Sequence, residues 1–211
     1  MEDNLKSIED IRTIRKMMEE STRFLSLSGL SGVFAGVFAI IGSCIAYFVI
    51  LKNGTIHYDQ YLSSMTETET AALRLKFVAD ATGVLALSII FAFYFSLRIA
   101  KREGKTFWSP VSKRLLINMF IPLVTGGIFT VVLLLQNNIQ LVVPGLLIFY
   151  GLALVNAGKF TFDEVFYLGI LEIITGLVAA FFSGWGIIFW IIGFGILHII
   201  YGVVMYRKYE A

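Results

Sequence analysis

The sequence predicts an all-α polytopic membrane protein with six transmembrane helices, arranged as three helical hairpins and preceded by an amphipathic helix. Three observations support this prediction. Hydrophobic residues make up 57% of the 211 residues and charged residues only 15%, against about 25% charged residues in soluble domains. Long apolar runs alternate with short polar connections, as is typical of membrane-spanning helices. Most basic residues also fall in segments that lie on one side of the membrane when the number of spans is even.

The N-terminal segment precedes the apolar region. Between Asn4 and Arg23, apolar residues recur every three to four positions with charged residues between them, which predicts an amphipathic helix within residues 1–23. This helix would lie on the membrane surface or against the protein's own cytoplasmic face, or it would dock a cytoplasmic protein partner through residues 4–23. The apolar run after it is too long for a signal peptide, so we expect the first span to stay in the mature chain.

Six spans follow, placed by their apolar runs and by the signals that begin and end helices. In the long outer connection at 52–70, which contains His57, the capping signal Thr66-x-x-Glu69 predicts that the second helix begins outside the membrane. At 1.5 Å per residue, a helix from Thr66 to Ala100 would be about 50 Å long, more than a hydrocarbon core of about 30 Å requires. The predicted spans are 24–51, 77–100, 114–135, 141–157, 165–182 and 187–206, with a tail at 208–211.

The basic residues predict the orientation of the spans. The N-terminal segment, the second connection, the fourth connection and the C-terminus carry five, six, one and two lysine or arginine residues, which is 14 of the chain's 17. Only Lys52, Arg74 and Lys76 fall on the other side. The positive-inside rule therefore places both termini in the cytoplasm.

Small residues predict close helix packing and an internal repeat. The three outward-going helices that begin the hairpins carry a hydroxyl residue followed by glycine, and each returning helix carries a tyrosine with a basic residue seven to nine positions later. This pattern predicts a threefold repeat of one hairpin, with a long connection inserted in the first copy. The alternative is that these residues mark only close helix contacts. The residues predicted to pack helices are Ser28, Gly32, Gly36, Gly126 and Gly176.

Two ionisable residues are expected inside the membrane, Glu172 in the fifth span and His198 in the sixth. Glu172 lies eight residues after Glu164, and His198 lies nine before Arg207, so both would lie about 12 to 14 Å from the cytoplasmic side. Their helices are adjacent and antiparallel, which allows a hydrogen bond between the two side chains. The further candidate members of this intramembrane polar site are Thr175, Tyr201, Tyr150 and Asn156.

Such a pair has both functional and structural interpretations. It could act as a proton relay, a cation site or a pH-sensitive latch; it could instead join two helices by a hydrogen bond of about 1 kcal/mol. When the hairpins are aligned, Pro122 and Ser28 match Glu172, whereas Leu147 and Phe91 match His198. The pair is therefore not part of the repeated scaffold, which favours a special role.

The sequence contains no catalytic or cofactor motif. It has no Walker loop, GxGxxG, HExxH, GxSxG or CxxC. Two histidines and the single Cys44 are too few for a metal site or a bis-histidine haem, so we expect no catalytic residue, cofactor or metal. A net charge of +2, with the basic residues sorted by membrane side, argues against nucleic-acid binding. The expected partner is the lipid bilayer, and the sequence leaves the oligomeric state open.

Both ends of the chain resemble a known family. The segment EDIRTIRKMMEESTRFLSLSGLSGVFAGVFAIIG and the segment WIIGFGILHIIYGVVMYRKYE look like those of an uncharacterised family of small bacterial multi-pass membrane proteins. This resemblance implies six spans in a bacterial inner membrane and no assigned activity. The hairpin pattern is also similar in architecture to the HdeD-like acid-resistance membrane proteins, without a shared diagnostic motif.

These observations lead to two functional hypotheses. The first is a non-enzymatic inner-membrane protein that senses or responds to envelope conditions, with Glu172 and His198 as its pH- or ligand-sensitive element and the amphipathic helix as its output. The alternative is a small proton- or ion-coupled transporter or channel with a pathway past Glu172. A transporter needs a wet cavity that reaches Glu172, whereas a sensor does not.

Overall fold

A computed structural model of the chain describes residues 24, 27–51, 67–102, 104, 107–182 and 184–211. These residues are helical, without a strand among them. The amphipathic helix expected at 4–23 and most of the expected outer connection, including His57, lie outside the described residues. Six helices in the described part are long and apolar enough to cross a membrane, which confirms the expected number of such helices.

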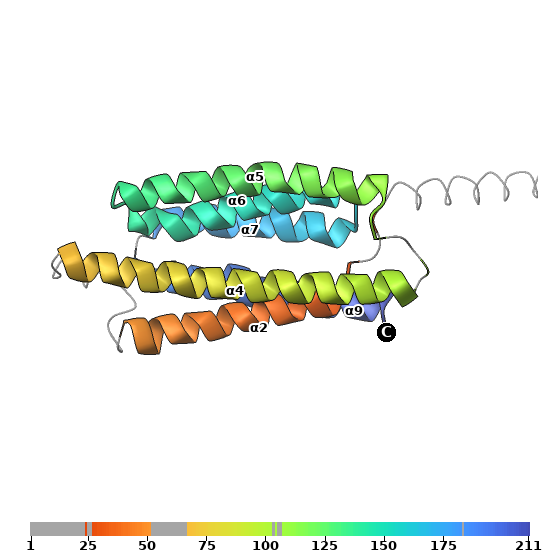
Figure 1. Ribbon diagram of the computed structural model, residues 1–211, viewed down its shortest axis with the longest axis horizontal. Helices are drawn as coiled ribbons and strands as arrows, with labels where there is room; N and C mark the ends of the chain where they lie inside the picture. The colour runs from red at the N-terminus through yellow and green to blue at the C-terminus, as the bar shows by residue number, and fades with distance from the viewer. Residues whose placement is uncertain (1–23, 25–26, 52–66, 103, 105–106, 183) are drawn as a thin grey trace, which may run out of the picture.

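The six helices are rods of unequal length (Figure 1). The first is α2 (Gly29–Ile45), extended by the π-helical segment η1 (Ala46–Ile50). The second is α4 (Glu67–Arg102), which is about 54 Å long at 1.5 Å per residue. The other rods are α5 (Pro110–Leu135), the short 3-10 segment η2 (Ile139–Leu141) with α6 (Val142–Gly158), α7 (Asp163–Phe181), and α8 (Gly186–Trp190) continued by the π-helical η3 (Ile191–Leu197) and α9 (His198–Tyr209).

Two helices begin at residues other than those predicted from the sequence, and local interactions explain both differences. The first helix begins at Gly29 and not at Phe24, because Phe24 lies outside the helix and its N–H donates to the Phe160 carbonyl at 2.7 Å. The third begins at Pro110, four residues earlier than predicted, because Ser109 and Ser112 form a reciprocal capping box and Pro110 suits the first helical position.

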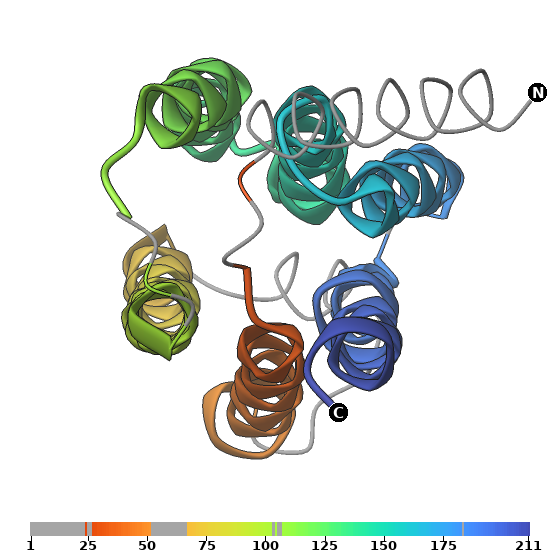
Figure 2. The same cartoon turned by 90° about the vertical axis from the view of Figure 1, so that its right-hand side faces the viewer.

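The rods form an open ring when viewed along their axes (Figure 2). Around this ring the order is α4, α2, α9, α7, α6 and α5, and each of these helices packs on the next. The most extensive contacts join α6 to α7 and α2 to the rod of η3 and α9. The ring is open between its two ends, because α4 packs mainly on α2 and α5 packs mainly on α6.

Glycines account for the closest helix contacts. Between α6 and α7, a Cβ added at Gly151 would lie 2.6 Å from the carbonyl oxygen of Gly169. Between α2 and the last rod, a Cβ added at Gly36 would lie 2.6 Å from the carbonyl oxygen of Gly195. These separations leave no room for a side chain, so glycine is required where the two backbones touch.

The other residues predicted to pack helices lie at contacts of two kinds. Gly32 lies against the Tyr201 ring, Gly126 against Phe149 and Gly176 against Ile148. Ser28 instead precedes the first turn of α2, where its hydroxyl donates to the Glu210 carboxylate at 3.2 Å. The Gly29 N–H also donates to Glu210, so the last described turn caps the first helix.

An apolar cluster lies at one end of the ring. We call this the basic end, because the helix ends there carry Arg98, Lys101, Arg102, Lys113, Arg114, Lys159, Arg207 and Lys208. The cluster joins Leu115 of α5, Leu154 of α6, Leu168 of α7 and Met205 of α9. Phe24 is also a buried member. The Thr161 hydroxyl donates to its carbonyl at 2.6 Å, so the link before α2 is held to the α6–α7 turn.

Candidate functional site

Three polar side chains from three helices meet inside the bundle. Glu172 comes from the middle of α7 and has no exposed surface, whereas His198 is the first residue of α9 and is 5% exposed. Tyr150 comes from the middle of α6, and its ring stacks on the imidazole at a centroid distance of 5.4 Å. We call these three residues the buried triad.

The distances within the buried triad place His198 in the centre. Its Nδ1 lies 3.3 Å from Oε1 of Glu172, and its Nε2 lies 2.8 Å from the Tyr150 hydroxyl. Nδ1 also lies 3.1 Å from the Gly193 carbonyl oxygen in η3. The imidazole therefore links α6 to α7 and to its own rod.

The Gly193 carbonyl determines the protonation of one ring nitrogen. A carbonyl oxygen only accepts hydrogen bonds, so Nδ1 of His198 must carry a proton. When the ring is neutral, Nε2 then accepts a hydrogen bond from Tyr150; when the ring is an imidazolium, Nε2 donates to Tyr150. The Nδ1–H is therefore present in both charge states.

The Glu172 carboxylate is buried without a hydrogen bond. The Nδ1–H of His198 makes its hydrogen bond to Gly193, so neither Oε1 nor Oε2 of Glu172 has a hydrogen-bond partner among the described residues. A Cβ added at Gly193 would lie 2.7 Å from Oε2, which shows that the carboxylate lies against bare backbone. The neighbouring Leu147 side chain is also completely buried. A fully charged carboxylate is costly in such surroundings.

Three of the candidate residues from the sequence lie outside the buried triad. The Thr175 hydroxyl donates to the Leu171 carbonyl, and the Asn156 amide donates to the Leu152 carbonyl, so both side chains bond to their own helices. Such bonds to the preceding turn are common for short polar side chains in apolar helices. Tyr201 packs on the apolar cluster at the basic end and against Gly32.

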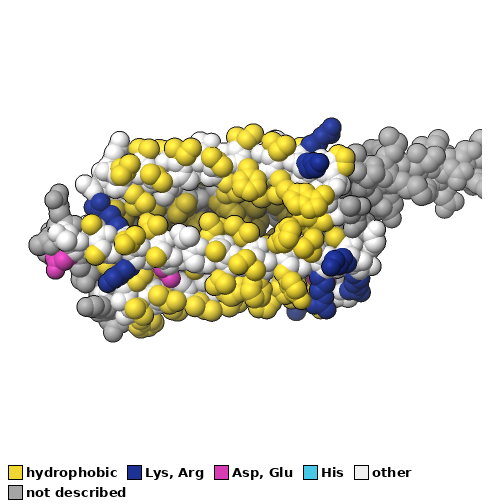
Figure 3. Space-filling view, viewed as in Figure 1, with side chains coloured by type: hydrophobic (Ala, Val, Ile, Leu, Met, Phe, Trp, Pro, Cys, Tyr) yellow, Lys and Arg dark blue, Asp and Glu magenta, His cyan; other side chains and the backbone are white. Residues whose placement is uncertain are grey.

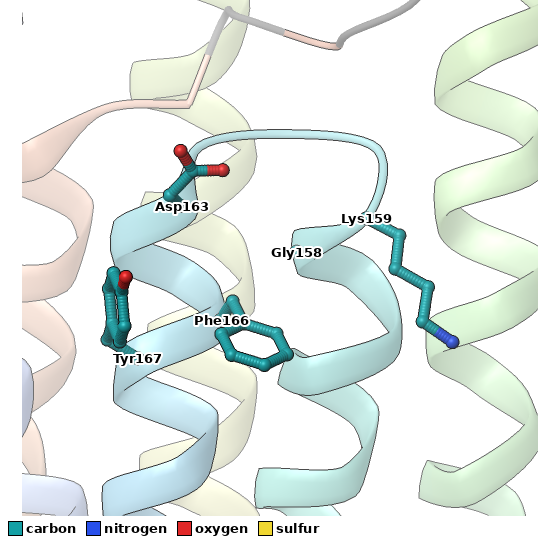
Figure 4. A pocket seen from close by; sticks show the side chains of 5 residues that line it. All are labelled: Gly158, Lys159, Asp163, Phe166 and Tyr167. Atoms are coloured by element: carbon teal, nitrogen blue, oxygen red, sulfur yellow. The ribbon is translucent and has the colours of Figure 1, made fainter.

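A shallow pocket lies elsewhere, beside the α6–α7 turn (Figure 4). It has a volume of about 260 Å³ and is lined by Gly158, Lys159, Asp163, Phe166 and Tyr167. Lys159 points away from Asp163 and Tyr167, so the polar groups do not converge on one point (Figure 4). No member of the buried triad lines it.

The other ionisable side chains of the described residues do not form a metal site. No group of three or more histidine, cysteine, aspartate or glutamate side chains in the described part could hold a metal ion. At the basic end, Lys208 donates to Glu164 at 2.5 Å, and the Tyr209 hydroxyl donates to the same carboxylate at 3.2 Å. This exposed pair ties α9 to α7.

The fold and the buried triad define a helical protein whose six apolar helices enclose an acid, a histidine and a tyrosine. No family model, no curated protein and no solved structure matches the chain. The function therefore has to be inferred from the geometry of the buried triad itself.

Proposed function

We propose that this is a non-enzymatic, multi-pass protein of a bacterial inner membrane that responds to envelope conditions through one proton shared within the buried triad. Both termini would lie in the cytoplasm, where the positive-inside rule places the basic end. The observation that carries the proposal is the Glu172 carboxylate, which is fully buried and has no hydrogen-bond partner among the described residues.

The number of protons on Glu172 and His198 explains why the buried triad would respond to pH. The site is electrically neutral only when Glu172 and His198 hold one proton between them, on the carboxyl group or on the second ring nitrogen. Removal of this proton leaves a buried carboxylate without a counter-ion, and addition of a second leaves a buried imidazolium without one. Both states are costly in an apolar interior. Gain or loss of a proton therefore favours a rearrangement of α6, α7 and α9.

The groups that surround the triad do not supply another charge. The ionisable side chain that α6 presents is Tyr150, and α9 adds Tyr201 one turn beyond His198. The segment η3 contributes the backbone of Gly193. In α2, which packs on the last rod, the one ionisable side chain is the exposed Cys44. The charges of Glu164 and Lys208 lie at the basic end and are paired with each other.

The link at Phe24 offers a route from the triad to the N-terminal segment. Phe24 follows the proposed amphipathic helix directly, and Phe160 and Thr161 hold its backbone against the α6–α7 turn. A shift between α6 and α7 would therefore move the attachment point of the N-terminal segment, which supports its proposed role as the output.

The order of helices around the ring supports the proposed threefold repeat. Each hairpin contributes two adjacent helices, and the second helix precedes the first in every pair along the order given above. In a threefold arrangement, the α6–α7 contact corresponds to the contact between the last rod and α2. The third equivalent position falls between α4 and α5, where the ring is open.

The alternative function is transport along a pathway past Glu172. This function requires water or an ion to reach the carboxylate, but Glu172 has no exposed surface. The closed geometry therefore favours a response element over an open pathway.

Hydrogen exchange in lipid nanodiscs tests the proposal. We expect exchange in the α6–α7 turn and at Phe24 to increase on both sides of a protected pH range in the parent. Glu172→Gln should alter this pH dependence, whereas the matched variant Glu164→Gln, on the same helix at the basic end, should keep it. Equal profiles for the parent and Glu172→Gln would contradict the proposal. A proton flux into liposomes that Glu172→Gln abolishes would support the transporter instead.

A further inference from the structure

The open side of the ring lacks the glycine contacts that close the other helix pairs. In α4 the one glycine is Gly83, and a Cβ added there would have no neighbour within 4 Å. In α5, Gly126 contacts α6, and Gly127 has no neighbour within 4 Å. The glycines at 151 and 202 directly follow tyrosines, but Phe95 follows the corresponding Tyr94 and stacks on Phe34 of α2. Among the described residues, the open side therefore has no glycine contact equivalent to those at Gly151 and Gly202.

An apolar groove results between α4 and α5. The space-filling view shows the surface hollowed between these helices, with hydrophobic side chains along it (Figure 3). Only 11% of the most apolar 18-residue stretch of each helix is buried, compared with 44% for α6. Large apolar side chains such as Leu85 and Ile128 are well exposed on them. At the basic end, Phe93 of α4 packs on Phe107, and Phe107 packs on Phe24.

Five cations lie on α4 and α5 at the basic end. Arg98, Lys101 and Arg102 lie in the last turns of α4, and Lys113 and Arg114 lie in the first turns of α5. All five are exposed. None of the five makes an ion pair with an acidic side chain in the part of the chain that the structure describes, where the pairs are His198 with Glu172 and Lys208 with Glu164. The first turn of α5 also contains no acidic residue.

We propose that the groove between α4 and α5 binds one anionic phospholipid. Its phosphate lies among the five cations, and its acyl chains fill the apolar groove. The charge complementarity selects an anionic headgroup, and the lateral opening of the groove admits the chains from the bilayer. The lipid thereby takes the place of the helix contact that α4 and α5 do not make. This inference concerns a different face from the buried triad and is independent of its protonation.

Lipid binding by the full-length protein tests this inference. The protein is purified in mild detergent, bound lipids are counted by native mass spectrometry, and phosphatidylglycerol and phosphatidylcholine are then titrated back. We expect the parent to retain one anionic phospholipid and to prefer phosphatidylglycerol. The double variant Arg102→Gln with Arg114→Gln should bind phosphatidylglycerol about 30-fold more weakly, because each basic residue near an anionic lipid contributes a factor of about five.

A matched control distinguishes lipid binding in the groove from a general effect of positive charge at this end of the protein. The double variant Lys159→Gln with Arg207→Gln removes two charges from the same end, but directly after α6 and in α9. It should retain the lipid. A second measurement uses the parent alone, in which raised salt should weaken phosphatidylglycerol binding and glycerol 3-phosphate, which has no acyl chains, should not displace the lipid.

Several results would overturn the inference. One is an equal loss of phosphatidylglycerol binding in the two double variants. The others are equal affinity of the parent for phosphatidylglycerol and phosphatidylcholine, and displacement of the bound lipid by glycerol 3-phosphate. A dimer cross-linked through cysteines placed on α4 and α5 would also overturn it, because a second copy would then fill the groove.

Discussion

Replacement of Glu172 by glutamine should reverse the sign of the slope with which the protein's stability changes with pH. In the parent, the closed state holds one proton on Glu172 and His198. In an opened state, where both groups reach water, each group gains or loses a proton independently of the other. Opening therefore releases a proton at the alkaline end of the pH range and takes one up at the acidic end.

The expected slopes follow from these proton counts. Each proton of difference changes the free energy of opening by about 1.4 kcal/mol per pH unit. The stability of the parent should fall as the pH rises toward the alkaline end of the range. In Glu172→Gln, no acid remains as a counter-ion for an imidazolium, so the closed state holds His198 in its neutral form. Its stability should therefore rise with pH from the acidic end of the range.

The assay is thermal or denaturant unfolding in detergent, followed by far-ultraviolet circular dichroism between about pH 5 and 8.5. Glu164→Gln is the matched control, because Glu164 lies on the same helix and pairs with Lys208 at the exposed basic end. It should keep the shape of the parent profile. Parallel profiles for the parent and Glu172→Gln would refute the shared proton.

Three further substitutions test individual contacts. Tyr150→Phe removes the hydroxyl 2.8 Å from Nε2 of His198 and should lower the free energy of unfolding by about 1 kcal/mol; an unchanged unfolding midpoint would contradict the contact. Gly193→Ala places a Cβ against the Glu172 carboxylate and should cost about 1–3 kcal/mol, whereas Gly83→Ala, in open space, should be neutral or stabilising; equal effects in thermal unfolding would contradict the packing. Thr161→Val removes the hydrogen bond to the Phe24 carbonyl and should increase hydrogen exchange at Phe24 without altering the pH profile; unchanged exchange would show that this bond does not hold the link.

Much of the helical architecture follows from local sequence signals. The apolar runs predict six helices long enough to cross a membrane, and the signal at Thr66 predicts the start of α4, which begins at Glu67. The pattern of small residues predicts contacts at Gly32, Gly36 and Gly176, because a missing side chain is visible in sequence wherever two backbones must touch.

Other features depend on the positions of distant residues. The sequence does not predict the π-helical segment η3, which places the Gly193 carbonyl within reach of His198. Helix periodicity predicts that Tyr150 lies at the same depth as His198. It does not predict the bond between the Tyr150 hydroxyl and Nε2 of His198, because the rotation of each helix is set by packing against its neighbours. The link at Phe24 and the open side between α4 and α5 likewise follow from tertiary contacts.

Nitrogen-15 NMR of His198 tests the shared proton most directly. The chain has two histidines, so His57→Gln leaves His198 as the one labelled imidazole. We expect Nδ1 to carry a proton, because the Gly193 carbonyl oxygen accepts its hydrogen bond and the ring is buried. We also expect Glu172→Gln to change the shift of Nε2. A proton on Nε2 alone, or an Nε2 shift that Glu172→Gln leaves unchanged, would contradict the shared proton.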